Sequence, residues 1–168
     1  MSVDSFSMDS FNALPEDAAR GQLLACCAAP RWAEAVAAGR PYRSVEALHA
    51  AAEAALTDAD VADGLAGHPR IGERTADLRS QREQRKVAGA SAEVLAALAD
   101  GNLAYERRFG HVYLVCASGR GADELLGVLR DRLGNDPDTE RAVVRGELVA
   151  INRLRLDRML GELALGRV

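Results

Sequence analysis

A histidine followed by a proline stands in a glycine-flanked stretch, GLAGHPRIGERT, at residues 64–75. Because a proline restricts the preceding residue to extended conformations, Pro69 fixes the direction in which the His68 side chain leaves the backbone. An imidazole titrates near neutral pH, so a rigid and partly exposed His68 could act as a general acid or base. A loop histidine that bonds a backbone carbonyl is the commoner arrangement, and the residues alone leave both roles open.

A second group of polar residues, SQREQ at residues 80–84, follows closely. On a helix, Ser80, Glu83 and Gln84 stand at i, i+3 and i+4, so a hydroxyl, a carboxylate and an amide share one face. Such a face could orient a polar ligand. The alternative is a solvated surface on which Ser80 caps the helix. The neighbouring basic side chains point in other directions: Arg79, Arg82 and Arg85.

Two apolar stretches could contribute further groups to a site. The segment VCASG, residues 115–119, has small side chains that let a ligand approach its backbone, although a plain buried connector would have the same composition. Arg155 lies between Leu154 and Leu156 on a helix that we expect to be half-buried. A buried guanidinium needs a partner, which would be either a structural carboxylate or a bound anion.

Composition and charge argue against several classes of protein. The net charge of −4 gives no positive surface for DNA, RNA or an anionic membrane. The three histidines are scattered and no acidic cluster has ligand spacing, so we predict no metal site. Three cysteines, two of them adjacent, favour reduced thiols over a disulfide framework. No apolar run approaches the roughly 20 residues of a membrane span, and we find no secretion signal, so we expect a cytoplasmic protein.

Hydrophobic residues recur at helical spacing along most of the 168 residues. Aromatic residues make up only 4%, so alanine, leucine and valine must form most of a closely packed core. We therefore predict an all-α fold, a single-domain bundle of roughly eight helices over residues 1–168, with residues 1–12 flexible. The predicted helices cover residues 15–29, 30–39, 45–56, 57–67, 77–89, 91–110, 122–133 and 137 onward.

Two places depart from a plain helical pattern. Gly101 lies in the middle of the helix predicted over residues 91–110 and costs about 1 kcal/mol relative to alanine, which leaves one straight helix in question. The stretch HVYLVCASGRG, residues 111–121, is short, β-branched and apolar. It could form a buried strand, but no other stretch reads as a partner strand, so we predict an extended or irregular buried segment.

Taken together, these segments resemble the OHCU decarboxylase family, whose substrate is 2-oxo-4-hydroxy-4-carboxy-5-ureidoimidazoline (OHCU) and whose product is (S)-allantoin. The resemblance extends over nearly the whole chain, and the combination of HPRIG, S-x-x-E-Q and FGHVYLVCA carries it most specifically. It implies an all-helical, cofactor-free decarboxylase of urate degradation that acts on a small molecule. It also implies a homodimer.

The resemblance assigns roles to particular residues. His68 matches the family's catalytic histidine and Glu83 matches its catalytic glutamate. Arg155 matches the arginine of a C-terminal RL motif, for which Arg153 and Arg158 are alternatives within about one helical turn. The residues that match ligand-binding positions are Pro69, Ser80, Gln81, Arg82, Gln84, Val115, Cys116, Ala117, Ser118 and Gly119.

The sequence departs from a common version of the family in two places. HPRIGER stands where many members have HPDLG, and EQRKVAGA replaces a tighter ending after the glutamine. Neither change touches a matched catalytic position, so they bear on loop length and on the rim of the pocket. His111 lies close to the proposed pocket, and we interpret it as structural.

Two other functions compete with decarboxylation. One is a helical binding or interaction module that keeps the fold without the activity, but such a module need not retain His68 and Glu83. The other is a helical hydrolase for a related ring, which would need a water-activating arrangement that the sequence does not show.

Overall fold

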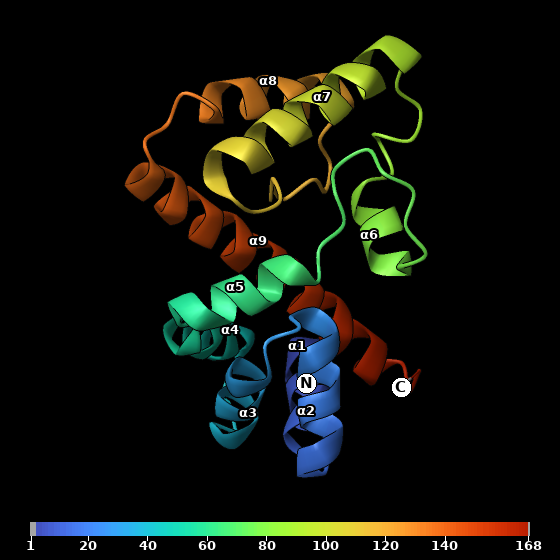
Figure 1. The fold of residues 1–168 in the computed structure, drawn as a ribbon. Helices are drawn as coiled ribbons and strands as arrows, with labels where there is room; N and C mark the ends of the chain where they lie inside the picture. Colours follow the sequence, from blue (N-terminus) through green and yellow to red (C-terminus); the bar gives the residue numbers. More distant parts are fainter. Residues whose placement is uncertain (1–2, 168) are drawn as a thin grey trace. The chain divides into compact units, whose positions relative to one another are not determined.

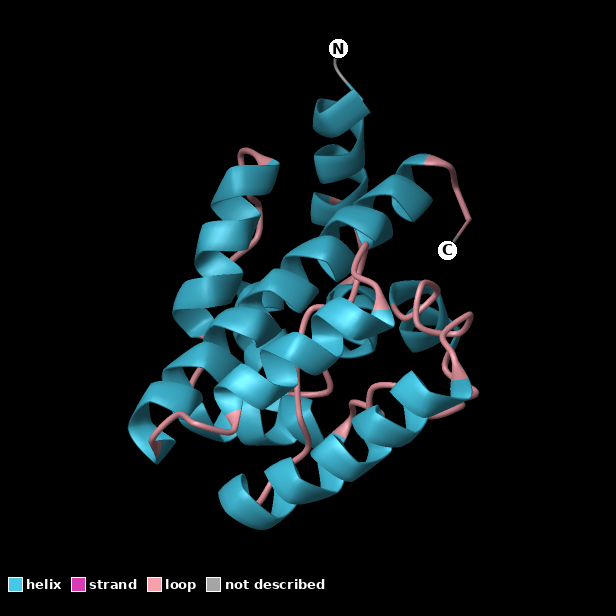
Figure 2. Ribbon diagram, turned by 90° about the horizontal axis from the view of Figure 1, so that it is seen from above, coloured by secondary structure: helices cyan, strands magenta, loops and turns pink. Residues whose placement is uncertain are grey.

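A computed structural model describes residues 3–167 and shows helices connected by loops, with no strand among these residues (Figures 1 and 2). The predicted all-α fold is confirmed, and the described residues contain nine helices. They are α1 (Val3–Asn12), α2 (Glu16–Cys26), α3 (Pro30–Ala38), α4 (Val45–Ala55), α5 (Asp58–Ala66), α6 (Leu78–Glu83), α7 (Ala92–Phe109), α8 (Ala122–Arg132) and α9 (Pro137–Ala164).

The helices belong to two compact units. Unit 1 contains the residues up to Gly67, together with Val149 and the residues after it, so it holds α1–α5 and the later part of α9. Unit 2 is His68–Leu148 and holds α6–α8 with the first part of α9. Most of the predicted site residues therefore lie in unit 2, and Arg155 lies in unit 1.

Capping residues set the helix boundaries of unit 1. Ser44 accepts a backbone N–H at the start of α4. At the start of α5, Thr57 and Asp60 form a capping box in which each side chain accepts the other's backbone N–H. Helix α3 packs against α2, α4 and α5, and its fully buried Trp32 donates its indole N–H to the Ala52 carbonyl at 2.8 Å.

The start of the chain differs from the flexible segment that we predicted. It forms α1, because Met8 and Phe11 are buried and need one apolar face. The Asn12 side chain donates to the carbonyl of Tyr42 and accepts from its N–H, each at 2.9 Å. The abundance of serine and aspartate in this segment favoured the prediction of flexibility, although Met8 and Phe11 are buried. Residues 1 and 2 lie outside the described part of the chain.

Helix α7 runs unbroken through Gly101 and packs against α8. A Cβ atom built at Gly101 would lie 2.6 Å from Cδ2 of Leu129, so the glycine permits a close approach of the two helices. Around this contact lies the buried core of unit 2, formed by Ile71, Val87, Leu98, Tyr105, Tyr113, Val115, Ala117, Ala122, Leu125, Leu126 and Leu129.

Helix α6 is shorter than the helix that we predicted over residues 77–89. It ends at Glu83, and turns follow in which Val87 donates to the Gln84 carbonyl and Ala90 donates to the Val87 carbonyl. These turns bury Val87, the one strongly apolar side chain of residues 84–90, in the core of unit 2. Tertiary burial therefore overrides the helical preference of the surrounding residues.

The prediction of an irregular segment after α7 is confirmed. Gly110 ends α7 in the left-handed conformation with φ of 79°, and residues 111–117 contain neither helix nor strand. Tyr113, Val115 and Ala117 point into the core of unit 2 from this segment. These three alternate positions follow the spacing of an extended chain, in which Leu114 is also buried.

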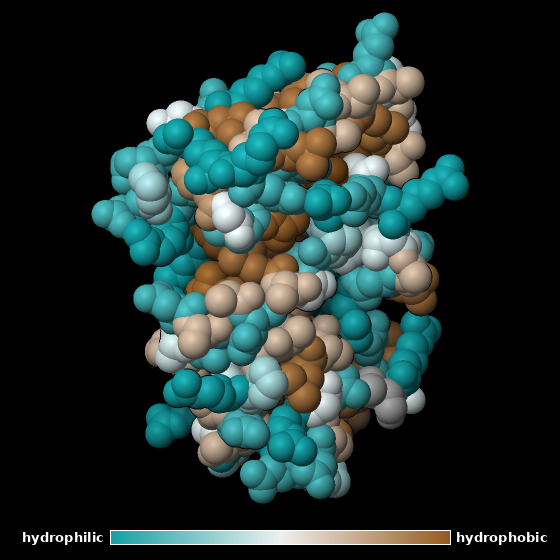
Figure 3. Space-filling model, viewed as in Figure 1, coloured by the Kyte–Doolittle hydropathy of each residue, from teal (hydrophilic) through white to brown (hydrophobic). Residues whose placement is uncertain are grey.

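The surface is mixed in character. Figure 3 shows a face on which hydrophilic atoms predominate, with smaller hydrophobic areas between them. The large hydrophobic side chains that are exposed are Phe6, Leu78, Leu103 and Leu165. Among the described residues, no helix combines the length and the apolar character that a membrane crossing requires.

We expect Gly101→Ala to lower the free energy of unfolding by about 1 kcal/mol. The cost of overpacking against buried Leu129, about 1–3 kcal/mol, outweighs a gain in helix propensity of about 1 kcal/mol. Urea denaturation measures the change. Gly127→Ala on α8 is the matched control, because nothing lies within 4 Å of its added Cβ, and it should stabilise the protein. Equal stabilisation by both substitutions would contradict the close approach.

Candidate active site

His68 is the first residue of unit 2 and directly follows Gly67, the residue at which α5 ends. His68 and Pro69 are both half-buried. The loop then turns at Gly72, whose φ of 89° lies in the left-handed region that favours glycine. His68 thus lies in a short loop between the end of α5 and the turn at Gly72, with Pro69 next to it.

Helix α6 begins with a cap that the sequence analysis assigned to the wrong residue. Asp77, not Ser80, is the N-cap, and its carboxylate accepts from the Ser80 backbone N–H at 2.9 Å and from the Ser80 hydroxyl at 2.6 Å. Ser80 and Glu83 are buried on one face of α6, and Gln84 is half-buried beside them. The side chains of the neighbouring arginines are exposed: Arg79, Arg82 and Arg85.

The two glutamines of SQREQ hold the loop that follows His68. Gln84 accepts the backbone N–H of Gly72 at 2.9 Å through its side-chain oxygen. Gln81 donates its side-chain amide to the carbonyl of Thr75 at 2.7 Å. These contacts use amides that we had matched to ligand-binding positions, so both residues shape the site through the loop.

A cavity of about 560 Å³ lies beside α6 in unit 2. Three residues predicted to bind ligand line it: Ser80, Gln81 and Gln84. The remaining lining comes from the loop, from the turns after α6 and from α7, namely Gly72, Glu73, Arg74, Thr75, Arg85, Val87, Ala88 and Leu95. Neither His68 nor Glu83 is part of this lining, so the cavity coincides only in part with the predicted pocket.

The segment 115–119 divides its side chains between core and surface. Val115 and Ala117 are buried in the core of unit 2, so only their backbone groups can meet a ligand. Cys116 and Ser118 are half-buried on the other side of the segment. The carboxylate of Glu147, on α9, accepts the Cys116 backbone N–H at 2.7 Å and fixes the middle of the segment.

Unit 2 brings this segment next to the region of α6. The ammonium group of Lys86 donates to the carbonyl of Gly119 at 2.9 Å. Burial raises the pKa of the Cys116 thiol, and the negative charges of Glu147 and Glu83 act in the same direction. The turns after α6 and the segment 115–119, with its half-buried Cys116 and Ser118, therefore lie next to each other in unit 2.

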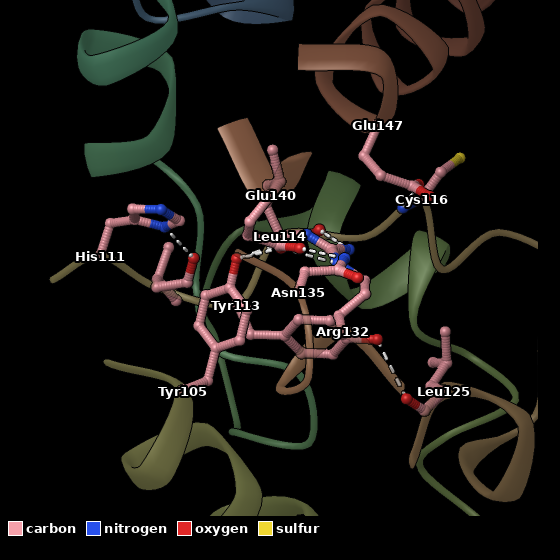
Figure 4. Close-up of polar contacts among 11 residues, drawn as sticks. Tyr105, His111, Tyr113, Leu114, Cys116, Leu125, Arg132, Asn135, Glu140 and Glu147 are labelled. Carbon is pink, nitrogen blue, oxygen red and sulfur yellow. Dashed lines mark hydrogen bonds and ion pairs between the residues drawn. The ribbon is translucent and has the colours of Figure 1, made fainter. Parts of the chain in front are cut away.

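A buried polar network binds the irregular segment at Leu114, next to residues 115–119 (Figure 4). The guanidinium of Arg132 donates to a carboxylate oxygen of Glu140 at 2.8 and 2.5 Å, and to the Leu114 carbonyl at 2.7 Å. Glu140 also accepts hydrogen bonds from the Tyr105 hydroxyl and, at 2.9 Å, from the Asn135 amide. Burial alone would raise the pKa of Glu140, but the hydrogen bonds from Arg132, Tyr105 and Asn135 bring it below its ordinary value.

In unit 1 the three candidate arginines differ in their surroundings. Arg155 is buried and donates to the Cys26 carbonyl at 3.1 Å. Its positive charge also acts on the buried Cys27 thiol, whose pKa burial raises. Arg153 is exposed and pairs with Glu53 at 2.7 Å, whereas Arg158 is half-buried. The expectation that Arg155 is a buried cation is therefore met, and its partner includes a backbone carbonyl.

His111 lies against aromatic side chains and next to its own backbone. The Nδ1 atom of His111 lies 3.0 Å from the Val112 carbonyl, and its ring contacts those of Tyr105 and Phe109, which agrees with a structural role. Within residues 3–167, no group of three or more histidine, cysteine, aspartate and glutamate side chains could hold a metal ion. The three cysteines are free thiols.

The sequence analysis missed the residues that hold the site together. Asp77 could have been found, since an aspartate three residues before Ser80 is a capping signal. Glu147, Lys86 and Arg132 gave no local signal, because each contacts backbone groups far away in the sequence. The structure therefore defines a class of protein: an all-α protein in which long-range polar contacts hold a histidine-bearing loop and an irregular backbone segment.

Comparison with known proteins agrees with that class. A model of the OHCU decarboxylase family matches residues 12–157. The chain is 31% identical over 137 residues to the 2-oxo-4-hydroxy-4-carboxy-5-ureidoimidazoline decarboxylase of Amia calva, which covers 76% of this chain and 78% of that protein. It is 30% identical over 150 residues to the uric acid degradation bifunctional protein TTL of Arabidopsis thaliana, covering 83% of this chain and 46% of that protein. The chain belongs to the OHCU decarboxylase family.

Two solved structures have a similar fold. A crystal structure of OHCU decarboxylase in the presence of (S)-allantoin has a TM-score of 0.72 and 25% sequence identity, over 82% of this chain and 96% of that chain. A crystal structure of (S)-allantoin synthase has a TM-score of 0.70, over 90% of this chain and 53% of that chain. Its sequence identity of 17% makes this second likeness one of fold alone.

We expect Glu140→Gln to lower the free energy of unfolding by about 3–5 kcal/mol at neutral pH, because it leaves buried Arg132 without its negative partner. Since the pKa of Glu140 is lowered in the folded protein, its contribution is present above the unfolded value of about 4.3 and is lost as the pH falls. Urea denaturation at pH 7 and pH 3 should therefore show a smaller difference from wild type at pH 3.

The matched control is Asp138→Asn, which breaks an exposed ion pair with Arg141 on the same helix. An exposed pair of this kind contributes about 0–1 kcal/mol. Equal losses in the two variants would contradict the dependence of unit 2 on the buried pair.

Proposed function

We propose that this protein decarboxylates OHCU to (S)-allantoin in urate degradation. The observation that carries the proposal is the presence of His68 and Glu83 at the matching positions of a chain that belongs to the OHCU decarboxylase family. The relative from Amia calva is named for this decarboxylation, and the crystallised decarboxylase was solved in the presence of (S)-allantoin.

The substrate supplies its own electron sink. Loss of CO₂ from the ring carbon that carries the hydroxyl group leaves an electron pair, which delocalises into the adjacent C=N bond. Neither pyridoxal phosphate nor thiamine is then required to stabilise the carbanion. The protein has to orient the ring, disperse the developing negative charge and deliver a proton to one face. We therefore propose that it works without a cofactor.

In this proposal His68 handles the proton. Its imidazole is half-buried in a loop that glutamine side chains hold, so it can present one nitrogen to the carbanion or to the substrate hydroxyl. Glu83, buried on α6, would orient the ring or the imidazole by accepting hydrogen bonds. General acid–base assistance of this kind contributes about 10²–10⁴-fold to a rate.

The remaining predicted residues would bind the substrate. Arg155 would hold an anionic part of the substrate, since a guanidinium pairs well with a carboxylate. The backbone of residues 115–119 would read the ureido group and the ring amides. We propose side-chain or backbone contacts of the same kind for the matched positions of the histidine loop and of α6, namely Pro69, Ser80, Gln81, Arg82 and Gln84.

We also propose that the enzyme is a cytoplasmic homodimer that binds neither nucleic acid nor a membrane. The three free thiols suit a reducing compartment, which supports a cytoplasmic protein. The family resemblance supports a homodimer, and the net charge of −4 argues against nucleic acid or an anionic membrane as a partner. Light scattering after gel filtration would measure the oligomeric state.

We expect His68→Gln to reduce the decarboxylation rate by about 10²–10⁴-fold without unfolding the protein, because it removes the titrating group and keeps a polar side chain. Substrate would be generated in place from urate with the two enzymes that act before this step. Circular dichroism then follows the appearance of optically active allantoin, and trapping of CO₂ follows the loss of the carboxylate.

His49→Gln serves as the control, because His49 belongs to unit 1, where it lies 2.8 Å from Asp157. It should retain wild-type turnover. Racemic product at the spontaneous rate from both wild type and His68→Gln would favour the inactive binding module. Turnover without release of CO₂ would favour the hydrolase.

A further inference from the structure

The loop that carries His68 is attached to α7 at two successive residues. The guanidinium of Arg70 donates from Nε to Oε1 of Glu106 at 2.6 Å and from Nη2 to Oε2 at 2.9 Å. The next residue, Ile71, accepts the side-chain amide of buried Asn102 at 2.9 Å through its carbonyl. Both attachments bridge more than thirty positions of sequence, so neither is a property of the loop itself.

The two attachment points on α7 form one surface. Asn102 and Glu106 stand four residues apart on α7, so their side chains lie on the same face, one turn above the other. The next residue of the loop, Gly72, donates its backbone N–H to the side chain of Gln84, at the end of α6. Three consecutive loop residues are thereby fixed just after Pro69, whose ring already restricts the backbone of His68.

We propose that Glu106 is a positioning residue for His68, acting through its bidentate bond to Arg70. The inference rests on the proposed function, in which His68 delivers a proton to one face of the substrate. Glu106 itself touches neither the imidazole nor a reacting atom. It sets where the loop, and with it the imidazole, stands relative to the elements of unit 2.

Geometry rather than stability is what this ion pair supplies. The side chains of Arg70 and Glu106 are 40% and 25% exposed, and pairs in such surroundings contribute little to the free energy of unfolding. A bidentate guanidinium–carboxylate contact nevertheless fixes orientation, because two parallel hydrogen bonds allow one relative placement of the two planes. Arg70 is also one of the residues at which this chain departs from the common HPDLG version of the loop.

The test compares Glu106→Gln, Arg70→Lys and Asp100→Asn with wild type. The first removes the charge, the second keeps the charge but loses the fork of the guanidinium, and the third removes an exposed carboxylate elsewhere on α7. A displacement of about 1 Å costs about 100-fold in rate, so we expect kcat to fall by tenfold to 100-fold in the first two variants. KM should change less than kcat, Tm should stay near that of wild type, and Asp100→Asn should behave as wild type.

A second readout does not depend on turnover. The chain has three histidines, so its imidazole C–H resonances can be assigned by single substitutions and followed by NMR. Glu106→Gln and Arg70→Lys should shift or broaden the resonance of His68 and leave that of His49, in unit 1, unchanged. A merely structural pair would lower Tm and leave the His68 resonance of the folded protein as it is.

The outcomes separate the two proposals. An active wild type whose kcat and His68 resonance are unaffected by Glu106→Gln overturns the positioning role and leaves the proposed function intact. Wild-type kcat in Arg70→Lys overturns the part played by the bidentate contact. Absence of CO₂ release by wild type overturns the proposed function, and the positioning role in this reaction falls with it.

Discussion

A buried ion pair between Arg132 of α8 and Glu140 of α9 is the contact on which the rest of unit 2 depends. Removing two charges from water is costly, and their attraction offsets that cost only when the remaining hydrogen-bonding groups are also satisfied. Here they are, because Glu140 also accepts from Tyr105 and Asn135, and Arg132 also donates to the Leu114 carbonyl. One network therefore joins α7, α8 and α9 to the irregular segment. Apolar packing also brings these helices together, but it is not directional. Hydrogen bonds fix the position of the irregular segment along its length, since no strand of the described residues pairs with it.

The irregular segment is held by side chains that bind its backbone groups one at a time. A strand partner would engage backbone groups along its whole length, and none exists among residues 3–167. Charged side chains replace it: Arg132 binds the Leu114 carbonyl, Glu147 binds the Cys116 N–H, and Lys86 binds the Gly119 carbonyl. Each side chain engages a single backbone group, and a charged group makes a stronger hydrogen bond than a neutral one. A segment held in this way can be rigid at the edge of a core and still turn other backbone groups toward a small molecule.

The sequence predicted what depends on local spacing and missed what depends on distant partners. Helical periodicity identified most helices, and the caps that begin α4 and α5, Ser44 and Thr57, are equally local signals. The sequence did not predict helix α1 or the end of α6 at Glu83, because the burial of Phe11 and Val87 depends on neighbours far along the chain. The candidate site divides in the same way. Motif resemblance selected His68 and the α6 residues, among them the two glutamines that hold the loop, whereas no pattern marks the charged side chains that make the longer-range contacts, with partners up to 36 positions away.

The two departures from the common family version make physical sense in this light. Arg70 and Lys86 both lie where the chain differs, and both make long-range contacts, with Glu106 and with the Gly119 carbonyl. The differences therefore fall on groups that hold the site, while the matched reacting groups are retained. In the proposed cofactor-free mechanism the substrate carries its own electron sink, so the contribution of the protein reduces to orienting the ring and protonating one face. In that mechanism, the face that receives the proton is set by where the loop places His68. The proposed mechanism therefore requires a rigid loop, and Arg70, at a position where this chain departs from the common version, helps to supply that rigidity through Glu106.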